Sequence, residues 1–188
     1  RIYGASDYAV SEGKGDFTEL GIAGVNENQD LYLLDWWTGQ ATADTWIDAQ
    51  LTMVKQWGPV KWASEAGVIR RAIEPFLNKR MQEKSIYVTM EWLPAVADKP
   101  TNCRSFQARA KQGKVYLPRG KAWAEDLVAQ LLRFPKAKHD DKVDVCGIFG
   151  RILDNMHGAF APSQPSLYVV ESDYGIEDDD NGDSWKTV

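Results

Sequence analysis

Carboxylates at several separated positions of this chain are placed where they could do chemistry. Asp7 lies in the middle of an apolar, β-prone stretch, where an ionised carboxylate is expensive to bury without a positive partner. Glu65 falls at the end of a short apolar segment, a place where open sheets commonly hold ligand-contacting residues. A third group of acids crowds into the start of an expected helix and comprises Asp140, Asp141 and Asp144.

The spacing within this third group places acids on a shared helix face. Asp141 and Asp144 are separated by i, i+3 spacing and Asp140 and Asp144 by i, i+4 spacing, so either pair lies side by side. Acids near a helix N-terminus are also stabilised by the helix dipole, and Asp140 could simply cap the helix. Neither explanation covers Asp144, which is flanked by valines in an otherwise apolar helix. The structural alternatives are a turn or buried hydrogen bond for Asp7, and an exposed strand end for Glu65.

Acids from the first strand, the fourth strand and a late helix can converge at the centre of a sheet, where divalent cations would relieve their mutual repulsion. Oxygen ligands of this kind select Mg²⁺ or Mn²⁺. Two such ions, roughly 3.5 to 4 Å apart, stabilise both the attacking and the leaving oxygen of a phosphodiester displacement. The expected reaction is therefore hydrolysis of a nucleic-acid backbone. Zinc is disfavoured, because His139 and His157 do not pair with suitably spaced cysteines.

The formal net charge of -5 is unusual for a protein that handles DNA, but the acids are concentrated near the end of the sequence. Residues 171–188 hold seven acids and one lysine, so the rest of the chain is close to neutral. Residues 99–121 contain no Asp or Glu and form one concentrated basic segment. We expect DNA to be bound by the cations of this segment, which are Lys99, Arg104, Arg109, Lys111, Lys114, Arg119 and Lys121.

The elements that must position these groups follow from hydrophobic periodicity and from turn and cap residues. We expect strands over residues 2–10, 17–25, 31–37, 60–64, 86–93 and 114–117. We expect helices over residues 42–57, 68–83, 104–111, 123–132 and 140–155, with Gly147 and Gly150 letting the last one lie close against the sheet. The result is an α/β sandwich with a mixed sheet of five or more strands, an antiparallel meander first, and helices on both faces.

Composition and motifs set further limits. Neither GxxxxGK[ST] nor GxGxxG occurs, which argues against nucleotide hydrolysis. No apolar run approaches the roughly 18 residues of a membrane span, and the N-terminal residues lack a signal peptide's regions, so we expect a cytosolic protein. Cys103 and Cys146 are expected to be free thiols in helices. We expect one domain over residues 1–158, followed by a linker and an acidic, flexible tail over residues 159–188.

Several segments together resemble the C-terminal nuclease domain of the large terminase subunit of tailed bacteriophages. They are ASDYAV, LYLLDWW, WGPVKWASEAG, PFLNKRM and FPKAKHDDKVDVCGIFGRILD, and the similarity covers about residues 1–158. The resemblance implies an RNase H-like fold with catalytic Asp7, Glu65 and Asp141. It also implies metal binding at these residues or at Asp140, with Asp144 binding through water or supporting the helix. A family DK...R pattern places Asp98, Lys99 and Arg104 at the border of a DNA groove, unless this stretch is merely a solvated loop.

The same resemblance implies an endonuclease that cuts concatemeric double-stranded DNA during packaging, with the portal protein and the terminase small subunit as partners. Large terminases also carry an N-terminal ATPase domain, and nothing in this sequence matches it, so we expect an excised domain or a fragment. The expected location is the cytoplasm of the infected host. Another RNase H-like nuclease, such as a Holliday-junction resolvase, and a non-catalytic domain that docks DNA or portal remain as alternatives. The acidic tail is either an inert solvated terminus, a contact for another packaging component or a DNA mimic.

Overall fold

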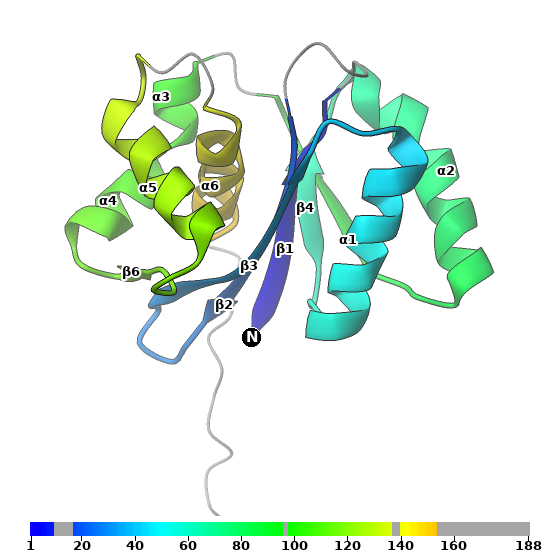
Figure 1. Ribbon diagram of the computed structural model, residues 1–188, viewed down its shortest axis with the longest axis horizontal. Coiled ribbons are helices and arrows are strands. Elements are labelled where there is room, and N and C mark those ends of the chain that lie inside the picture. The colour runs from blue at the N-terminus through cyan, green and yellow to red at the C-terminus, as the bar shows by residue number, and fades with distance from the viewer. Residues whose placement is uncertain (10–16, 96–97, 137–139, 154–188) are drawn as a thin grey trace, which may run out of the picture.

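A mixed six-stranded sheet forms the centre of the computed structural model, which describes residues 1–9, 17–95, 98–136 and 140–153 (Figure 1). The strands lie in the order β5-β4-β1-β2-β3-β6. Their bounds are β1 Ile2–Asp7, β2 Thr18–Val25, β3 Leu31–Gly39, β4 Trp62–Glu65, β5 Met90–Leu93 and β6 Val115–Tyr116. The predicted α/β class and the mixed sheet are confirmed.

The first three strands form the predicted antiparallel meander, and the later strands join it in parallel. β1 pairs antiparallel with β2, and β2 pairs antiparallel with β3. β4 runs parallel to β1, β5 runs parallel to β4, and β6 runs parallel to β3. In this register Asp7 is paired with Glu19 of β2, and Ser6 is paired with Ser64 of β4. The carboxyl ends of β1 and β4 therefore meet at one end of the sheet.

Helices cover both faces of this sheet (Figure 1). Two of them, α1 (Ala43–Trp57) and α2 (Val68–Lys84), pack on one face. The opposite face is covered by α3 (Lys99–Asn102), α4 (Arg104–Lys111), α5 (Ala122–Arg133) and α6 (Asp141–Ile152). Each layer encloses its own apolar core, so the sheet is buried on both sides. Among the described residues, no helix combines the length and the apolar content that a membrane crossing needs.

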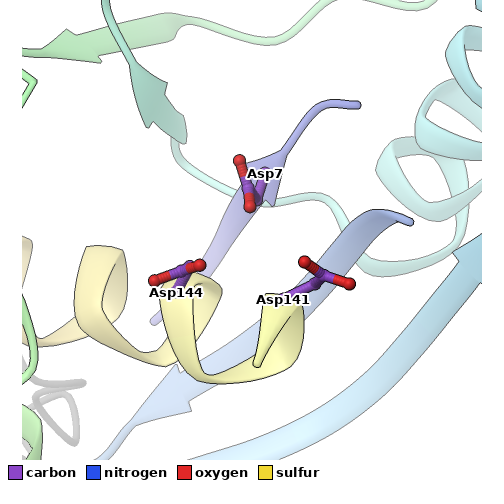
Figure 2. A group of neighbouring side chains, drawn as sticks. All are labelled: Asp7, Asp141 and Asp144. Atoms are coloured by element: carbon purple, nitrogen blue, oxygen red, sulfur yellow. The ribbon is translucent and has the colours of Figure 1, made fainter. Parts of the chain in front are cut away.

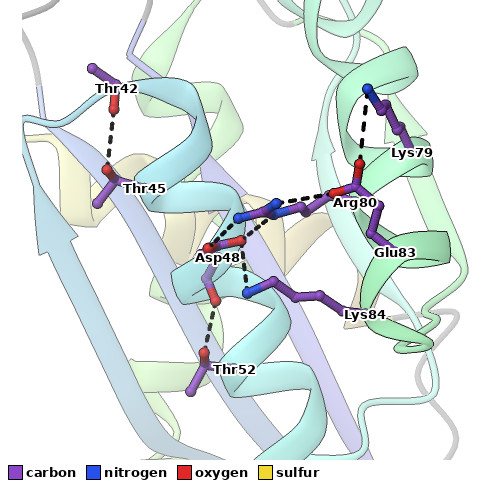
Figure 3. A network of polar contacts seen from close by, with 8 residues as sticks. All are labelled: Thr42, Thr45, Asp48, Thr52, Lys79, Arg80, Glu83 and Lys84. Atoms are coloured by element: carbon purple, nitrogen blue, oxygen red, sulfur yellow. Dashed lines mark hydrogen bonds and ion pairs between the residues drawn. The ribbon is translucent and has the colours of Figure 1, made fainter.

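An ion-pair network ties α1 to α2 at the surface, on the sheet face away from α6 (Figure 3). Asp48 of α1 accepts from Arg80 Nε at 2.7 Å and forms an ion pair with Lys84 Nζ at 3.0 Å. Hydrogen bonds from Arg80 are the main reason that the pKa of Asp48 is lowered to about 2. This network offers charged residues that are well removed from α6 and suitable as experimental controls.

The nearest neighbours of the α6 glycines lie in and between α3 and α4 and not in the sheet, where the prediction placed them. A Cβ on Gly150 would lie 2.7 Å from the backbone nitrogen of Phe106 in α4, and one on Gly147 would lie 3.0 Å from Asn102 of α3. Close approach to the sheet is instead permitted by Gly21 of β2, where a Cβ would lie 3.1 Å from Phe149. The glycines of α6 therefore bring α3 and α4 against it.

Several boundaries differ from the prediction. β5 begins at Met90 instead of residue 86, because its partner β4 is only four residues long. The short helix α3 was not expected, and the side chain of Asp98 caps it by accepting from the Thr101 amide. Cys103 lies between α3 and α4 rather than within a helix, and both cysteines are free and buried. The predicted end of the last helix at residue 155, the domain boundary at 158 and the acidic tail lie outside the described residues.

A candidate metal centre at the end of the sheet

Three carboxylates that are distant in the sequence come together where β1 ends (Figure 2). Asp7 is the last residue of β1, and Asp141 and Asp144 lie in the first turn of α6. One carboxylate oxygen from each residue lies within 4.8 Å of the other two. In an octahedral Mg²⁺ site with ligands at about 2.1 Å, ligand oxygens are about 3 to 4 Å apart. The three side chains can therefore share one divalent ion after small adjustments.

The local structure explains why these side chains meet. Side chains alternate between the two faces of a strand, so Asp7 follows Tyr3 and Ala5 on the face that packs against α6. The i, i+3 spacing of Asp141 and Asp144 puts both on one side of the first helical turn. The Asp141 carboxylate also accepts from the backbone amide of Phe17, just before β2, at 3.4 Å. Strand and helix thus hold the acids at one spot.

The electrostatics of the cluster favour a bound cation. Burial and the nearby carboxylates of Asp144, Asp141 and Glu65 raise the pKa of Asp7 to about 7, and Lys99 only partly offsets them. Burial also raises the pKa of Asp144, against the opposing effect of its hydrogen bond from Lys99. A carboxylate that is hard to ionise beside other carboxylates is one that a divalent cation can stabilise in its charged form.

Lys99 and Asp140 form the outer side of this cluster. Lys99 Nζ donates to Asp140 Oδ1 and to Asp144 Oδ2, both at 2.7 Å. Asp140 stands at the N-cap position of α6, but its side chain makes no capping hydrogen bond. Lys99 therefore binds Asp140 and one oxygen of Asp144. Asp144 also belongs to the three-acid cluster with Asp7 and Asp141, whereas Asp140 does not.

Glu65 lies next in register to Asp7 but is bound by an arginine. Since Ser64 pairs with Ser6 in the parallel β1 and β4 strands, Glu65 and Asp7 are neighbours at the two strand ends. Glu65 Oε1 forms an ion pair with Arg151 Nη1 of α6 at 2.9 Å. Among the described residues, Glu65 does not belong to the group whose oxygens lie within 4.8 Å of one another.

A buried ion pair beneath the site was not anticipated from the sequence. Lys142 Nζ donates to Glu19 Oε1 at 2.9 Å, and the two side chains are 5% and 2% exposed. Glu19 Oε2 also accepts from Trp36 Nε1 and Thr38 Oγ1. A Glu within the apolar run of the second strand was the available signal, of the same kind that singled out Asp7.

The basic segment does not lie entirely at this end of the sheet. Lys99 is at the acidic cluster, and Arg104 is exposed at the start of α4. Arg109 donates to the carbonyl of Gln29, and Lys114 Nζ donates to the carbonyl of Asn28 at 2.8 Å, both in the turn between β2 and β3. That turn is at the end of the sheet opposite to the acids, because Asp7 pairs with Glu19 near the start of β2, whereas the turn follows Val25 at its end. Arg119 and Lys121 are exposed in the connection after β6, and Lys111 is exposed at the end of α4.

Solved structures with the same fold include large terminases of thermophilic bacteriophages. The large terminase nuclease of the thermophilic phage G20c, solved with bound zinc, is 15% identical, with a TM-score of 0.57 and 80% of each chain covered. The large terminase of a second thermophilic bacteriophage, solved in complex with ADP, is 11% identical with a TM-score of 0.58. That match covers 80% of this chain and 39% of the terminase chain, so this chain spans about two fifths of the length of that terminase.

A virus-encoded resolvase shares the fold as well. The Holliday junction resolvase of fowlpox virus is 10% identical with a TM-score of 0.51, and the match covers 83% of this chain and all of the resolvase. Comparisons with protein families and with curated proteins give no match. The predicted fold class is thus confirmed: this chain has the RNase H-like fold of the nuclease domains of phage large terminases.

Proposed function

We propose that this chain is a metal-dependent endonuclease domain. The observation that carries the proposal is the convergence of Asp7, Asp141 and Asp144 at the end of the central sheet. The fold supports it, because the solved structures that share it include terminase nucleases and resolvases. The predicted divalent metal fits this donor set, because hard cations such as Mg²⁺ and Mn²⁺ prefer carboxylate oxygens. When bound, such a cation supplies Lewis acidity toward a phosphodiester and lowers the pKa of water.

The residues of the chain have separate tasks in this proposal. Asp7, Asp141 and Asp144 hold the cation, and the strand and helix that carry them fix its position. Glu65 is the carboxylate beside Asp7 that would hold a second cation, and it is paired with Arg151 in the metal-free chain. Lys99 lies at the edge of the cluster with half of its side chain exposed, so its ammonium group can bind a backbone phosphate that approaches the site.

Within this class we propose the nuclease of a DNA-packaging terminase large subunit, which cuts concatemeric double-stranded DNA in the cytoplasm of the infected host by two-metal hydrolysis. The sequence segments that resemble this family, which include the acids Asp140, Asp141 and Asp144 at the start of α6, support this choice over other RNase H-like nucleases. An ATPase domain, the portal protein and the terminase small subunit are the partners that follow from the proposal.

A resolvase is the second candidate, because the fowlpox virus resolvase is covered over its whole length. A cleavage assay on linear duplex DNA and on a four-way junction, with Mg²⁺ or Mn²⁺, separates the two enzymes. We expect cutting of the linear duplex, and a strict preference for the junction would favour the resolvase.

Active-site variants test whether the chain is a nuclease at all. Asp7→Asn and Asp144→Asn should each lower cleavage by about a hundredfold or more while the fold remains intact. Asp48→Asn is the matched control, because it removes a carboxylate on the opposite helical layer. If both site variants cut at the rate of the unaltered protein, the acids are structural and the domain only docks DNA or another protein.

A further inference from the structure

The guanidinium group of Arg151 is bound to Glu65, the carboxylate beside Asp7 at the end of β4. Its Nη1 lies 2.9 Å from Glu65 Oε1, and the two side chains are 17% and 33% exposed. A partly buried ion pair is screened less by solvent and salt than an exposed one. Glu65 is therefore already neutralised by a cation that belongs to the chain itself.

Arg151 lies further along α6 than the acids of the three-acid cluster. Arg151 is seven residues after Asp144 in α6, which is about two turns or roughly 10 Å along the helix axis. Seven residues also return to nearly the same helix face, so both side chains are directed toward the same part of the sheet. With this contact in place, the oxygens of Glu65 lie outside the group formed by Asp7, Asp141 and Asp144 among the described residues.

The arginine has other acceptors that do not depend on Glu65. Its Nη1 also donates to Asn102 Oδ1 at 3.3 Å, and its Nη2 donates to the carbonyl of Pro94. A buried donor is destabilising mainly when it has no acceptor. Because two acceptors remain, the guanidinium group keeps hydrogen-bond partners when Glu65 leaves Arg151. Rotation about the side-chain torsions of the glutamate redirects its carboxylate.

We propose that Arg151 is the built-in counter-ion of Glu65, so that the free protein binds one divalent cation tightly at Asp7, Asp141 and Asp144. The second cation binds only when Glu65 exchanges Arg151 for the metal. This inference rests on the proposed nuclease function. The negative phosphates of bound DNA favour that exchange, because a phosphate is another anionic partner for an arginine and its oxygens are ligands for a divalent cation. Arg151 is thus a positioning residue that acts through Glu65.

Counting bound Mn²⁺ tests the inference without measuring cleavage. Calorimetric titration and the EPR signal of free Mn²⁺ give the number and affinity of sites in the DNA-free chain. We expect one tight ion for the unaltered protein. Arg151→Gln should strengthen binding of a second ion by about tenfold or more. The double variant Glu65→Gln with Arg151→Gln should lose the second ion and keep the first. Arg109→Gln is the matched control, since it removes a guanidinium at the opposite end of the sheet.

The ways in which the inference can fail are distinguishable. Two ions bound with equal affinity by the unaltered protein, or an unchanged second affinity in Arg151→Gln, would overturn the role of Arg151 and leave the nuclease proposal standing. Absence of any Mn²⁺ site that depends on Asp7 would overturn both. If Arg151→Gln does not give a cooperative melting transition, Arg151→Lys replaces it in the test. Lysine keeps the charge but lacks the planar guanidinium group that donates to all three acceptors. The affinity for the second Mn²⁺ ion should then lie between those of the unaltered protein and a chain without the cation.

Discussion

Lys142 Nζ lies 2.9 Å from Glu19 Oε1, and this buried ion pair joins the residue after Asp141 to the strand neighbour of Asp7. The pair therefore links α6 to β2, and β2 is hydrogen-bonded to β1. The two elements that carry the proposed metal ligands, β1 and α6, are thus held together. Lys142 also contacts the exposed Asp126 at 3.0 Å, whereas Glu19 is only 1% exposed. The two partners should consequently respond differently to substitution.

Lys142→Met should destabilise the fold more than Glu19→Gln. The first change leaves a buried carboxylate without its cation, which is expected to lower the free energy of unfolding by about 3 kcal/mol or more. The second leaves Lys142 with Asp126 and should lower it by about 1 to 2 kcal/mol. Urea unfolding of both single variants and of the double variant measures the coupling. Equal losses below about 1 kcal/mol would show that the pair is not a significant link.

Asp7→Asn should stabilise the metal-free protein at alkaline pH. The folded pKa of Asp7 is raised to about 7, so the proton on its carboxyl stabilises the fold. This contribution is complete below the unfolded pKa of about 3.9 and is lost as the pH rises through 7. In EDTA, the melting temperature of the unaltered protein should therefore fall between pH 5 and pH 8 relative to Asp7→Asn, with a difference of several degrees at pH 8.

Asp48→Asn provides the control for this pH dependence. The pKa of Asp48 is lowered to about 2, so its stabilising effect is complete above the unfolded pKa and is lost only as the pH falls toward 2. Its effect on the melting temperature should be constant between pH 5 and pH 8. If Asp7→Asn shows the same flat profile, the raised pKa of Asp7 is refuted. Mn²⁺ should raise the melting temperature of the unaltered protein at pH 8 and have little effect on Asp7→Asn.

Lys99→Met should change DNA binding and metal binding in opposite directions. The loss of a phosphate contact should weaken DNA affinity and reduce the slope of log K against log salt by about 0.9. The loss of a cation from Asp140 and Asp144 should strengthen Mn²⁺ binding by a few fold. Fluorescence anisotropy over a salt series and Mn²⁺ titration measure the two effects, with Lys55→Met on α1 as the control. An unaltered salt slope would place the DNA elsewhere.

Gly150→Ala should loosen α6 from α4. The added Cβ would lie 2.7 Å from the backbone nitrogen of Phe106, which cannot move without shifting α4. Overpacking of this kind typically destabilises a protein by about 1 to 3 kcal/mol. Gly67→Ala is the control, because nothing lies within 4 Å of a Cβ at that position. Thermal or urea unfolding compares the two, and an equal effect of both would argue against a tight contact at Gly150.

Apolar surroundings made Asp7 and Asp144 recognisable in the sequence, because local hydrophobicity reveals a charged residue that needs a partner. Helical spacing allowed either Asp140 or Asp141 to accompany Asp144, and the structure separates them: Asp141 lies in the three-acid cluster, whereas Asp140 is paired with Lys99. The contact between Glu65 and Arg151 joins residues 86 positions apart, and no local pattern encodes it. The meander was predictable from alternation and turns, whereas the length of β5 depends on β4, its neighbour in space.

The shape of the sheet margins also bears on how the protein behaves at high concentration. The outermost strands, β5 and β6, have four and two residues. Unpaired backbone groups on a long outer strand invite pairing with another chain and lead to aggregation. The β5 margin therefore offers a neighbouring molecule little backbone, but among the described residues β6 pairs only with Leu31 and Tyr32, so the outer side of β3 from Leu33 to Gly39 is the margin where pairing with another molecule is to be looked for.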